Sequence, residues 1–467
     1  MNSSTPRHLE PALLAEITAG HASAREVLQD CITRIASSNS QVNSFTDTTF
    51  ERAFAEADAV DQRRLRGLPL PPLAGMPYAV KNLFDMKGVV TRAGSKINRE
   101  QAPATQDAFL VQCMQAAGAV LLGGLNMDEY AYGFTTENSH DGACHNPHDL
   151  ARSAGGSSGG SGAAVAAGQV PVALGSDTNG SIRVPASLCG VWGLKPTFGR
   201  LSRRGTYPFV HNLDHLGPLA NSVEHLAWVY DALQAPDTLD PGCHARAVQP
   251  TSAQLMRGID GLRIGLLDGY FHDNAGPSAH AAVQQAARSL GAVEAAQWPD
   301  AALARAAAFI TSASEGGSLH LGDLRTRAAD FEPLSVDRFI AGALQPVAWY
   351  LQAQRFRRSY RDKVNALFKQ WDILLAPATP VAAPLLGTEW LQINGTQHPC
   401  RPALGLLTQP ISFAGCPVVA APLWPESTGG LPIGVQIISA PWREDLALRA
   451  AWVLQEAGIA HLKPVVW

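Results

Sequence analysis

The sequence predicts an α/β fold in which a central, largely parallel or mixed β-sheet is covered by helices on both faces. Short apolar strands alternate with amphipathic helices along most of the 467 residues, which is the pattern of such layered folds. Charged residues make up only 16%, below the usual ~25%, so little of the chain is left for solvated tails. The 42 glycines and 32 prolines indicate many loops between the elements.

The first 66 residues are expected to form an N-terminal helical layer that is integral to the fold. Ser23 and Glu26 have capping-box spacing, and apolar residues then recur at helical intervals over residues 23–36. A more polar helix ends near Arg66, and a stretch rich in proline and glycine follows it. We therefore divide the chain into residues 1–66 and a catalytic body of residues 67–467 within one structural domain.

The body alternates strands with helices, and no internal repeat is present. Glycine or proline ends most of these elements, as expected at turns and helix C-termini. The strands are expected at residues 78–80, 119–122, 262–267, 373–375 and 435–438, and the helices at 107–117, from Pro277 to the stop at Gly291, and at 444–456.

Charge and cysteine content exclude several classes of protein. A net charge of −4 provides no basic field for nucleic acid or an anionic membrane. The seven scattered cysteines contain no C-x-x-C pair, which argues against a disulfide framework and a zinc finger. The polar start, Met1 to Glu10, resembles no signal peptide, and no apolar run is long enough to span a membrane. We expect a cytoplasmic protein with reduced thiols.

A glycine- and serine-rich segment at residues 154–162, AGGSSGGSG, runs into the small apolar residues 163–167. A loop that opens a helix presents N–H groups and the positive end of the helix dipole to an anion. The alternatives are a flexible linker and a phosphate-binding loop. No Gly-Lys-Ser/Thr and no G-x-G-x-x-G is present, so the phosphate alternative is weak.

A second polar cluster, GSDTNGSIRVP at residues 175–185, contains Ser181. Consecutive amides from Thr178 to Ser181 in a tight turn would point at one oxygen, which is the geometry of an oxyanion hole. Asn179 and Gly180 both tolerate positive φ. The alternative is an ordinary turn in which Ser181 caps the next segment.

A nucleophilic serine needs a base, and the sequence offers two choices. His211 and His215, which flank Asp214, resemble a histidine base or half of a metal site, but no H-E-x-x-H glutamate and no third ligand accompany them. Lys81 is the better candidate, because apolar neighbours in MPYAVKNLF would bury it and lower its pKa. The alternative is a strand-end lysine that extends to water.

Together, Lys81 and the two serine motifs resemble the amidase signature family. The first loop serine, Ser157, lies 76 residues after Lys81, and Ser181 follows 24 residues later. The resemblance extends through residues 190–197 and 213–218 and runs from about residue 10 to the C-terminus. It implies the amidase signature fold and a Ser-cisSer-Lys triad in which Ser181 is the nucleophile, Ser157 relays the proton and Lys81 is the base. It also implies an acyl-enzyme intermediate and no metal or cofactor.

Three further stretches, residues 126–138, 175–207 and 346–365, are similar to those of one subgroup of this family. The enzymes of that subgroup act in the breakdown of cyanuric acid. That likeness implies hydrolysis of 1-carboxybiuret to urea-1,3-dicarboxylate and ammonia. It also implies a small helical accessory subunit similar to the C subunit of tRNA-dependent amidotransferases, and a homo- or hetero-oligomer.

Two positions bear on the substrate. The segment at residues 335–342 resembles the amidotransferase A-subunit segment whose arginine holds a carboxylate, so Arg338 is expected to bind a substrate carboxylate. Gly405 stands where the glutamine-binding subgroup has an aspartate for the α-amino group. The resemblance therefore implies a small amide with a carboxylate and no amine.

The expected substrate-binding residues are Thr178, Asn179, Gly180, Arg338 and Tyr130. Asn179 replaces a glycine of many relatives, and a structural role is an equal alternative for Tyr130 and for Arg183. The rival functions are a glutaminase A subunit of a tRNA-dependent amidotransferase, an amidase for another ureido or oxamate-like compound, and a scaffold without activity.

Overall fold

The computed structural model describes residues 12–465, and its centre is one mixed sheet. The predicted polar start at residues 1–10 lies outside the described residues. Across the sheet the strands are β1 (Phe45–Thr48), β3 (Val120–Leu125), β2 (Pro77–Lys81), β8 (Val172–Asp177), β10 (His215–Ala220), β9 (Trp192–Lys195), β16 (Val418–Leu423), β17 (Ile433–Ser439), β13 (Ile373–Pro377), β11 (Ile264–Leu267) and β12 (Glu294–Ala296).

The pairing confirms the expected mixed sheet. Strands β3, β2 and β8 are parallel, as are β13, β11 and β12 at the other side. From β8 through β10, β9, β16 and β17 to β13, each strand is antiparallel to the next, and β1 is antiparallel to β3. The sheet is therefore less parallel than the alternation of strands and helices indicates.

Helices cover both faces, as predicted. Along β2 the side chains of Tyr78 and Val80 enter one hydrophobic core, and that of Ala79 enters the other, because successive residues of a strand point to opposite faces. The core that contains Ala79 also receives α1 (Leu13–Ala19), α2 (Ala24–Val42), α3 (Phe50–Leu65) and α5 (Gly159–Ala166). The other core receives α4 (Phe109–Ala116), α7 (Val223–Leu233), α9 (Pro277–Leu290) and α16 (Glu444–Glu456).

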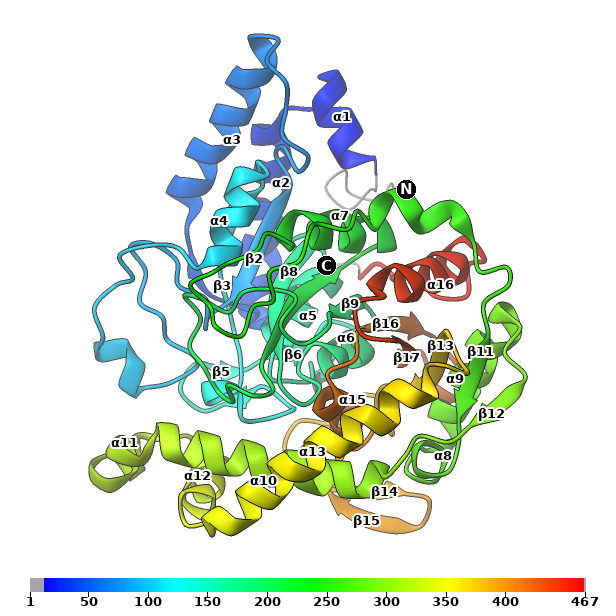
Figure 1. Ribbon diagram of the computed structural model, residues 1–467. Coiled ribbons are helices and arrows are strands. Elements are labelled where there is room, and N and C mark those ends of the chain that lie inside the picture. Colours follow the sequence, from blue (N-terminus) through cyan, green and yellow to red (C-terminus); the bar gives the residue numbers. More distant parts are fainter. Residues whose placement is uncertain (1–11, 466–467) are drawn as a thin grey trace.

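The N-terminal helices α1, α2 and α3 lie together at one end of the molecule, drawn in blue (Figure 1). The predicted capping box is present: the Ser23 hydroxyl accepts the Glu26 N–H, and the Glu26 carboxylate accepts the Ser23 N–H. Helix α2 extends to Val42, six residues beyond the predicted end, and stops at Asn43 in the left-handed conformation. Strand β1, which was not predicted, lies between α2 and α3 and pairs with β3.

At the opposite end, α10 (Ala301–Leu319), α12 (Val336–Ala343) and the long α13 (Val347–Leu367) lie side by side (Figure 1). The short helices α6 (Arg183–Cys189), α14 (Cys400–Ala403) and α15 (Gln409–Ala414) complete the surroundings of the site. The predicted strands and helices of the body are all present, with ends that differ by up to three residues. Within residues 12–465, none of the helices combines the length and the apolar character that crossing a membrane requires.

Candidate active site

Lys81 lies where two parallel strands end at the same edge of the sheet. Strands β2 and β8 run side by side with Val80 opposite Leu174, so Lys81 and Ser176 emerge next to each other. Lys81 Nζ donates to Ser157 Oγ at 2.7 Å and to Ser176 Oγ at 2.9 Å. The lysine is fully buried, so the alternative in which it extends to water is wrong.

Burial makes Lys81 a candidate for a base. Loss of solvation lowers the pKa of its amine from the ordinary 10.5 to about 7, although the nearby carboxylates Asp128, Asp214 and Asp177 oppose this shift. A lysine with a pKa of about 7 is neutral in about half of the molecules near pH 7 and in most of them one pH unit higher, and a neutral amine can accept a proton.

The glycine-rich segment is a buried loop that opens α5. Ser157 has no exposed surface, and the Gly156–Ser157 peptide bond is cis. A side chain at Gly156 would overlap the carboxylate of Asp128, whose own N–H donates to the Ser157 carbonyl at 3.3 Å. A flexible linker would not be packed in this way, so the linker alternative is wrong.

The residue 178–181 turn connects β8 to α6 and lies against this loop. The Ser158 N–H donates to the Ser181 carbonyl at 3.3 Å, which joins the two serine motifs. Among the described residues, the N–H groups of Asn179, Gly180 and Ser181 have no acceptor, and the Ser181 hydroxyl has no partner either. Orphaned N–H groups beside a serine are the requirement for an oxyanion hole.

Gly180 is the position in the turn that needs glycine. Its φ is +143°, and a Cβ there would overlap the Thr408 hydroxyl. Asn179 does not adopt a positive φ, so its tolerance of that conformation is not used.

A buried ion pair anchors both ends of the turn. The Arg183 guanidinium donates from Nε and Nη2 to the two oxygens of Asp177, each at 2.9 Å. Burial alone would raise the pKa of Asp177, but Arg183 holds it well below its usual value. Arg183 also donates to Gln436 Oε1 at 2.7 Å and to the Thr408 carbonyl at 3.1 Å. These contacts favour the structural alternative for Arg183.

The side chains of Thr178 and Asn179 are held by residues far away in the sequence. The Thr178 hydroxyl donates to Asp214 at 2.6 Å, and Asn179 Nδ2 donates to the Ser312 hydroxyl on α10 at 2.8 Å. Asn179 Oδ1 is buried and has no partner among the described residues. Ser312 orients this free acceptor, and no sequence signal pointed to Ser312.

The predicted residues Arg338 and Tyr130 lie in different surroundings. Arg338 Nη1 donates to the Tyr132 carbonyl at 3.1 Å, and its guanidinium lies 3.8 Å from the centre of the Tyr132 ring. Tyr130 is buried among aromatic rings, and its hydroxyl contacts Ser95 at 2.7 Å and Asn98 at 3.2 Å. The contacts of Tyr130 favour its structural alternative.

Gly405 has a packing reason to be glycine. A Cβ at this position would lie 2.5 Å from the Phe134 ring. The ring therefore occupies the space that an aspartate side chain at residue 405 would need.

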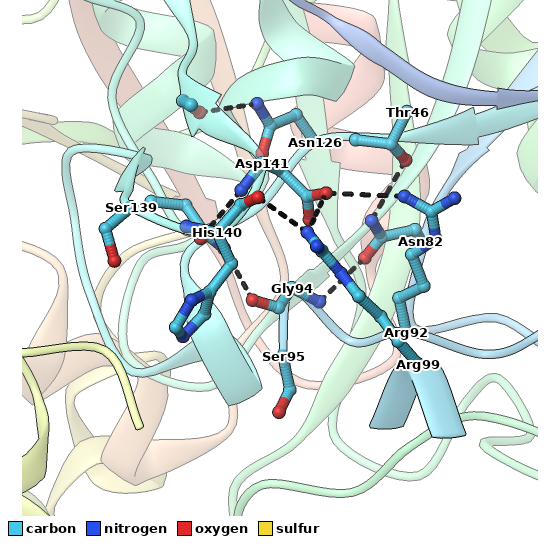
Figure 2. Close-up of polar contacts among 12 residues, drawn as sticks. Thr46, Asn82, Arg92, Gly94, Ser95, Arg99, Asn126, Ser139, His140 and Asp141 are labelled. Carbon is cyan, nitrogen blue, oxygen red and sulfur yellow. Dashed lines mark hydrogen bonds and ion pairs between the residues drawn. The ribbon is translucent and has the colours of Figure 1, made fainter. Parts of the chain in front are cut away.

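A polar network surrounds the residues that follow β2 and β3 (Figure 2). Asn82, which follows Lys81, donates to Thr46 at 3.0 Å and accepts the Gly94 N–H at 3.1 Å. Arg92 and Arg99 converge on Asp141 in the adjoining loop, at 3.3 and 2.7 Å (Figure 2). These contacts hold the backbone around Lys81 in place.

Neither of the two histidines considered as bases is hydrogen-bonded to Ser157 or Ser181 in the described part of the chain. His211 is exposed. His215 is buried, contacts the carbonyls of Leu213 and Asp177 at 2.6 and 3.0 Å, and has a pKa that burial holds well below the ordinary value. In the described part of the chain, no cluster of three histidine, cysteine or acidic residues is placed to hold a metal ion.

Comparison with known proteins finds relatives over nearly the whole chain. The profile of the amidase family matches residues 26–448. The chain is 70% identical to AtzE, a subunit of the 1-carboxybiuret hydrolase of Pseudomonas sp. (strain ADP), over 97% of this chain and 99% of that one. It is 38% identical to the A subunit of the glutamyl-tRNA(Gln) amidotransferase of Chromohalobacter salexigens, over 97% and 96% of the two chains.

Solved structures show the same relationships. One, described as a vestigial protein complex that reveals the evolutionary origins of an s-triazine catabolic enzyme, superposes with a TM-score of 0.96 at 70% identity and covers 97% of this chain and 99% of that one. The A subunit of the glutamyl-tRNA(Gln) amidotransferase of Thermotoga maritima superposes with a TM-score of 0.83 at 26% identity, over the whole of both chains.

Proposed function

The chain belongs to the amidase family, and from this premise we propose that it hydrolyses 1-carboxybiuret to urea-1,3-dicarboxylate and ammonia. The observation that carries the proposal is the buried contact between Lys81 and Ser157, next to a turn that contains Ser181 and three free N–H groups. The 70% identity to one subunit of a 1-carboxybiuret hydrolase supports the choice of substrate.

The proposed reaction proceeds through an acyl-enzyme. Neutral Lys81 takes the proton of Ser157 as Ser157 takes that of Ser181, and Ser181 Oγ attacks the terminal amide carbon. The N–H groups of residues 179–181 stabilise the oxyanion. The proton returns from Lys81 through Ser157 to the leaving nitrogen, the C–N bond breaks and ammonia departs. Water, deprotonated along the same route, then attacks the acyl carbon and releases Ser181.

The pH dependence of the wild-type enzyme tests the role of Lys81 as base. We expect kcat/KM to fall about tenfold for each pH unit below about 7, because burial lowers the pKa of Lys81 to about 7 and the protonated amine cannot accept a proton. Ammonia release measured between about pH 5 and about pH 9 checks this. The rate of Ser181 labelling by a fluorophosphonate should show the same acid limb, and a flat profile in both assays would contradict the assignment.

Arg338 is proposed to bind the substrate carboxylate. Its guanidinium is fixed by the Tyr132 carbonyl and ring, and the Phe134 ring excludes an anion at position 405 that would bind an α-amino group. Arg338→Ala is expected to raise KM for 1-carboxybiuret about 10- to 100-fold, since a charge-assisted hydrogen bond is lost. Biuret, which lacks the carboxylate, should be affected much less. An unchanged KM for 1-carboxybiuret would remove this assignment.

The substrate itself is tested by ammonia release from 1-carboxybiuret, biuret, allophanate, oxamate and glutamine, with Ser181→Ala as the control. Selective turnover of 1-carboxybiuret is expected. Turnover of glutamine would instead place the chain with the amidotransferase A subunits, to one of which it is 38% identical.

We also propose that the chain works with a small helical accessory subunit similar to the amidotransferase C subunit. The support is that a relative of 70% identity is described in a protein complex. The chain should form a stable complex with such a small helical subunit when the two are co-expressed. In size-exclusion chromatography the two proteins should then elute together. Elution of the two proteins apart would contradict this part of the proposal.

A further inference from the structure

Arg401 presents buried hydrogen-bond donors that no described residue satisfies. Its Nη2 contacts Asp128 Oδ1 at 3.0 Å, and its side chain is only 15% exposed. The Nε and Nη1 atoms are buried and have no partner within residues 12–465. A buried donor without a partner is costly, and more so in a charged group, so two such donors on a side chain that contacts the loop around Asp128 point to a ligand.

The place of Arg401 connects it to the proposed catalytic loop. Asp128, its ion-pair partner, donates its N–H to the Ser157 carbonyl at 3.3 Å. Arg401 Nη2 also lies 2.5 Å from the position that a Cβ at Gly133 would take. Glycine at residue 133 therefore leaves room for the guanidinium beside the 128–135 loop.

Arg338 contacts the same loop from α12. It donates to the carbonyl of Tyr132, the residue before Gly133. Burial lowers the pKa of Arg338, and the positive charge of nearby Arg401 lowers it further. The Tyr132 hydroxyl is also buried and has no partner in the described chain. Two guanidiniums thus lie against neighbouring residues of one loop, Arg338 at Tyr132 and Arg401 at Gly133.

The free donors of Arg401 suit an anionic group of a ligand that can accept several hydrogen bonds. Asp128, the carboxylate that contacts Arg401, is already engaged by Arg401 and by the Thr136 N–H at 3.0 Å. Glu137, which also acts on Arg401 electrostatically, accepts the Gly387 N–H at 2.9 Å. The Phe134 ring leaves no space for a further acid at position 405. Guanidinium groups bind carboxylates through their planar N–H donors.

We propose that Arg401 is a second specificity-determining residue, which binds the carboxylate of the substrate together with Arg338. This inference rests on the proposed hydrolysis of a carboxylated amide and names a residue that discriminates for the carboxylate. Neither the serine motifs nor the segment around Arg338 pointed to Arg401.

The test compares 1-carboxybiuret with biuret, which differ only by the carboxylate, in Arg401→Gln. We expect KM for 1-carboxybiuret to rise at least about tenfold and kcat to change by less than about threefold. Biuret, as a substrate or competitive inhibitor, should bind as it does to the wild type, and Arg401→Lys should recover part of the loss. The fluorophosphonate labelling rate of Ser181 should stay unchanged in both variants.

A matched control variant separates binding from structure. Arg357→Gln removes another buried arginine that also has an unpartnered nitrogen in the described chain, and it should leave the ratio of the two affinities unchanged. Equal losses for both ligands in Arg401→Gln, or slower labelling of Ser181, would overturn the inference, because a structural residue does not discriminate for the carboxylate.

A failure of the proposed function is recognised separately. If the wild type releases no ammonia from 1-carboxybiuret, the proposed function is wrong. The role of Arg401 is then judged by how well each ligand protects Ser181 from the fluorophosphonate. The inference is supported if 1-carboxybiuret protects the wild type better than biuret does and Arg401→Gln loses this difference. It is overturned if 1-carboxybiuret protects the wild type and Arg401→Gln equally well.

Discussion

Replacing Ser181 with alanine is expected to lower kcat by about 10⁴-fold or more, since removal of a catalytic nucleophile costs about this much in serine hydrolases. The fold should persist, because the Ser181 hydroxyl has no partner among the described residues and its removal breaks no internal hydrogen bond. The turn keeps the Asp177–Arg183 ion pair and the packing of Gly180 against Thr408. Ammonia release and the melting temperature of the purified variant measure the two effects.

A matched control is Ser161→Ala. Ser161 lies in the glycine-rich motif that contains Ser157, and its hydroxyl donates to the Leu174 carbonyl at 3.1 Å. Its removal costs a hydrogen bond but no proposed catalytic group, so its effect should be on stability more than on kcat. If Ser181→Ala kept wild-type turnover while folded, the proposed nucleophile would be wrong.

Lys81→Ala is expected to give the second large loss, about 10³-fold or more near neutral pH, with partial recovery at high pH. The amine contacts both Ser157 and Ser176, so its removal takes away the base and leaves two buried hydroxyls without their partner. Hydroxide replaces part of the base function as pH rises. The measurement is kcat/KM from about pH 6 to about pH 10.

Ser176→Ala is the graded comparison for that variant. It removes one of the two contacts of Lys81 and keeps the contact with Ser157, so a much smaller loss and a preserved acid limb are expected. Full activity of Lys81→Ala at pH 7 would exclude the lysine as the base. A drop in Ser176→Ala equal to that in Lys81→Ala would show that orientation of the amine, more than its presence, limits the rate.

Local patterns predicted the fold well. The capping box at Ser23 and Glu26 forms as expected, because it depends on residues within one helical turn. Strand β1 was missed because its four residues, FTDT, carry no apolar alternation, and its pairing with β3 supplies the order that the segment lacks by itself. The mixed sheet was predicted, but not which strands are antiparallel, since strand direction depends on connections between distant segments.

The sequence by itself determined the α/β class, the two serine motifs and the choice of Lys81, since each depends on residue type and spacing along the chain. Tertiary structure alone decided the electrostatics of the site and the contacts of its proposed substrate-binding groups. The pKa of Lys81 depends on complete burial between β3 and β8. The free oxygen of Asn179 depends on Ser312, and the unpaired donors of Arg401 depend on Asp128. Desolvation and hydrogen bonding act through space, and these partners lie more than 100 residues apart in sequence.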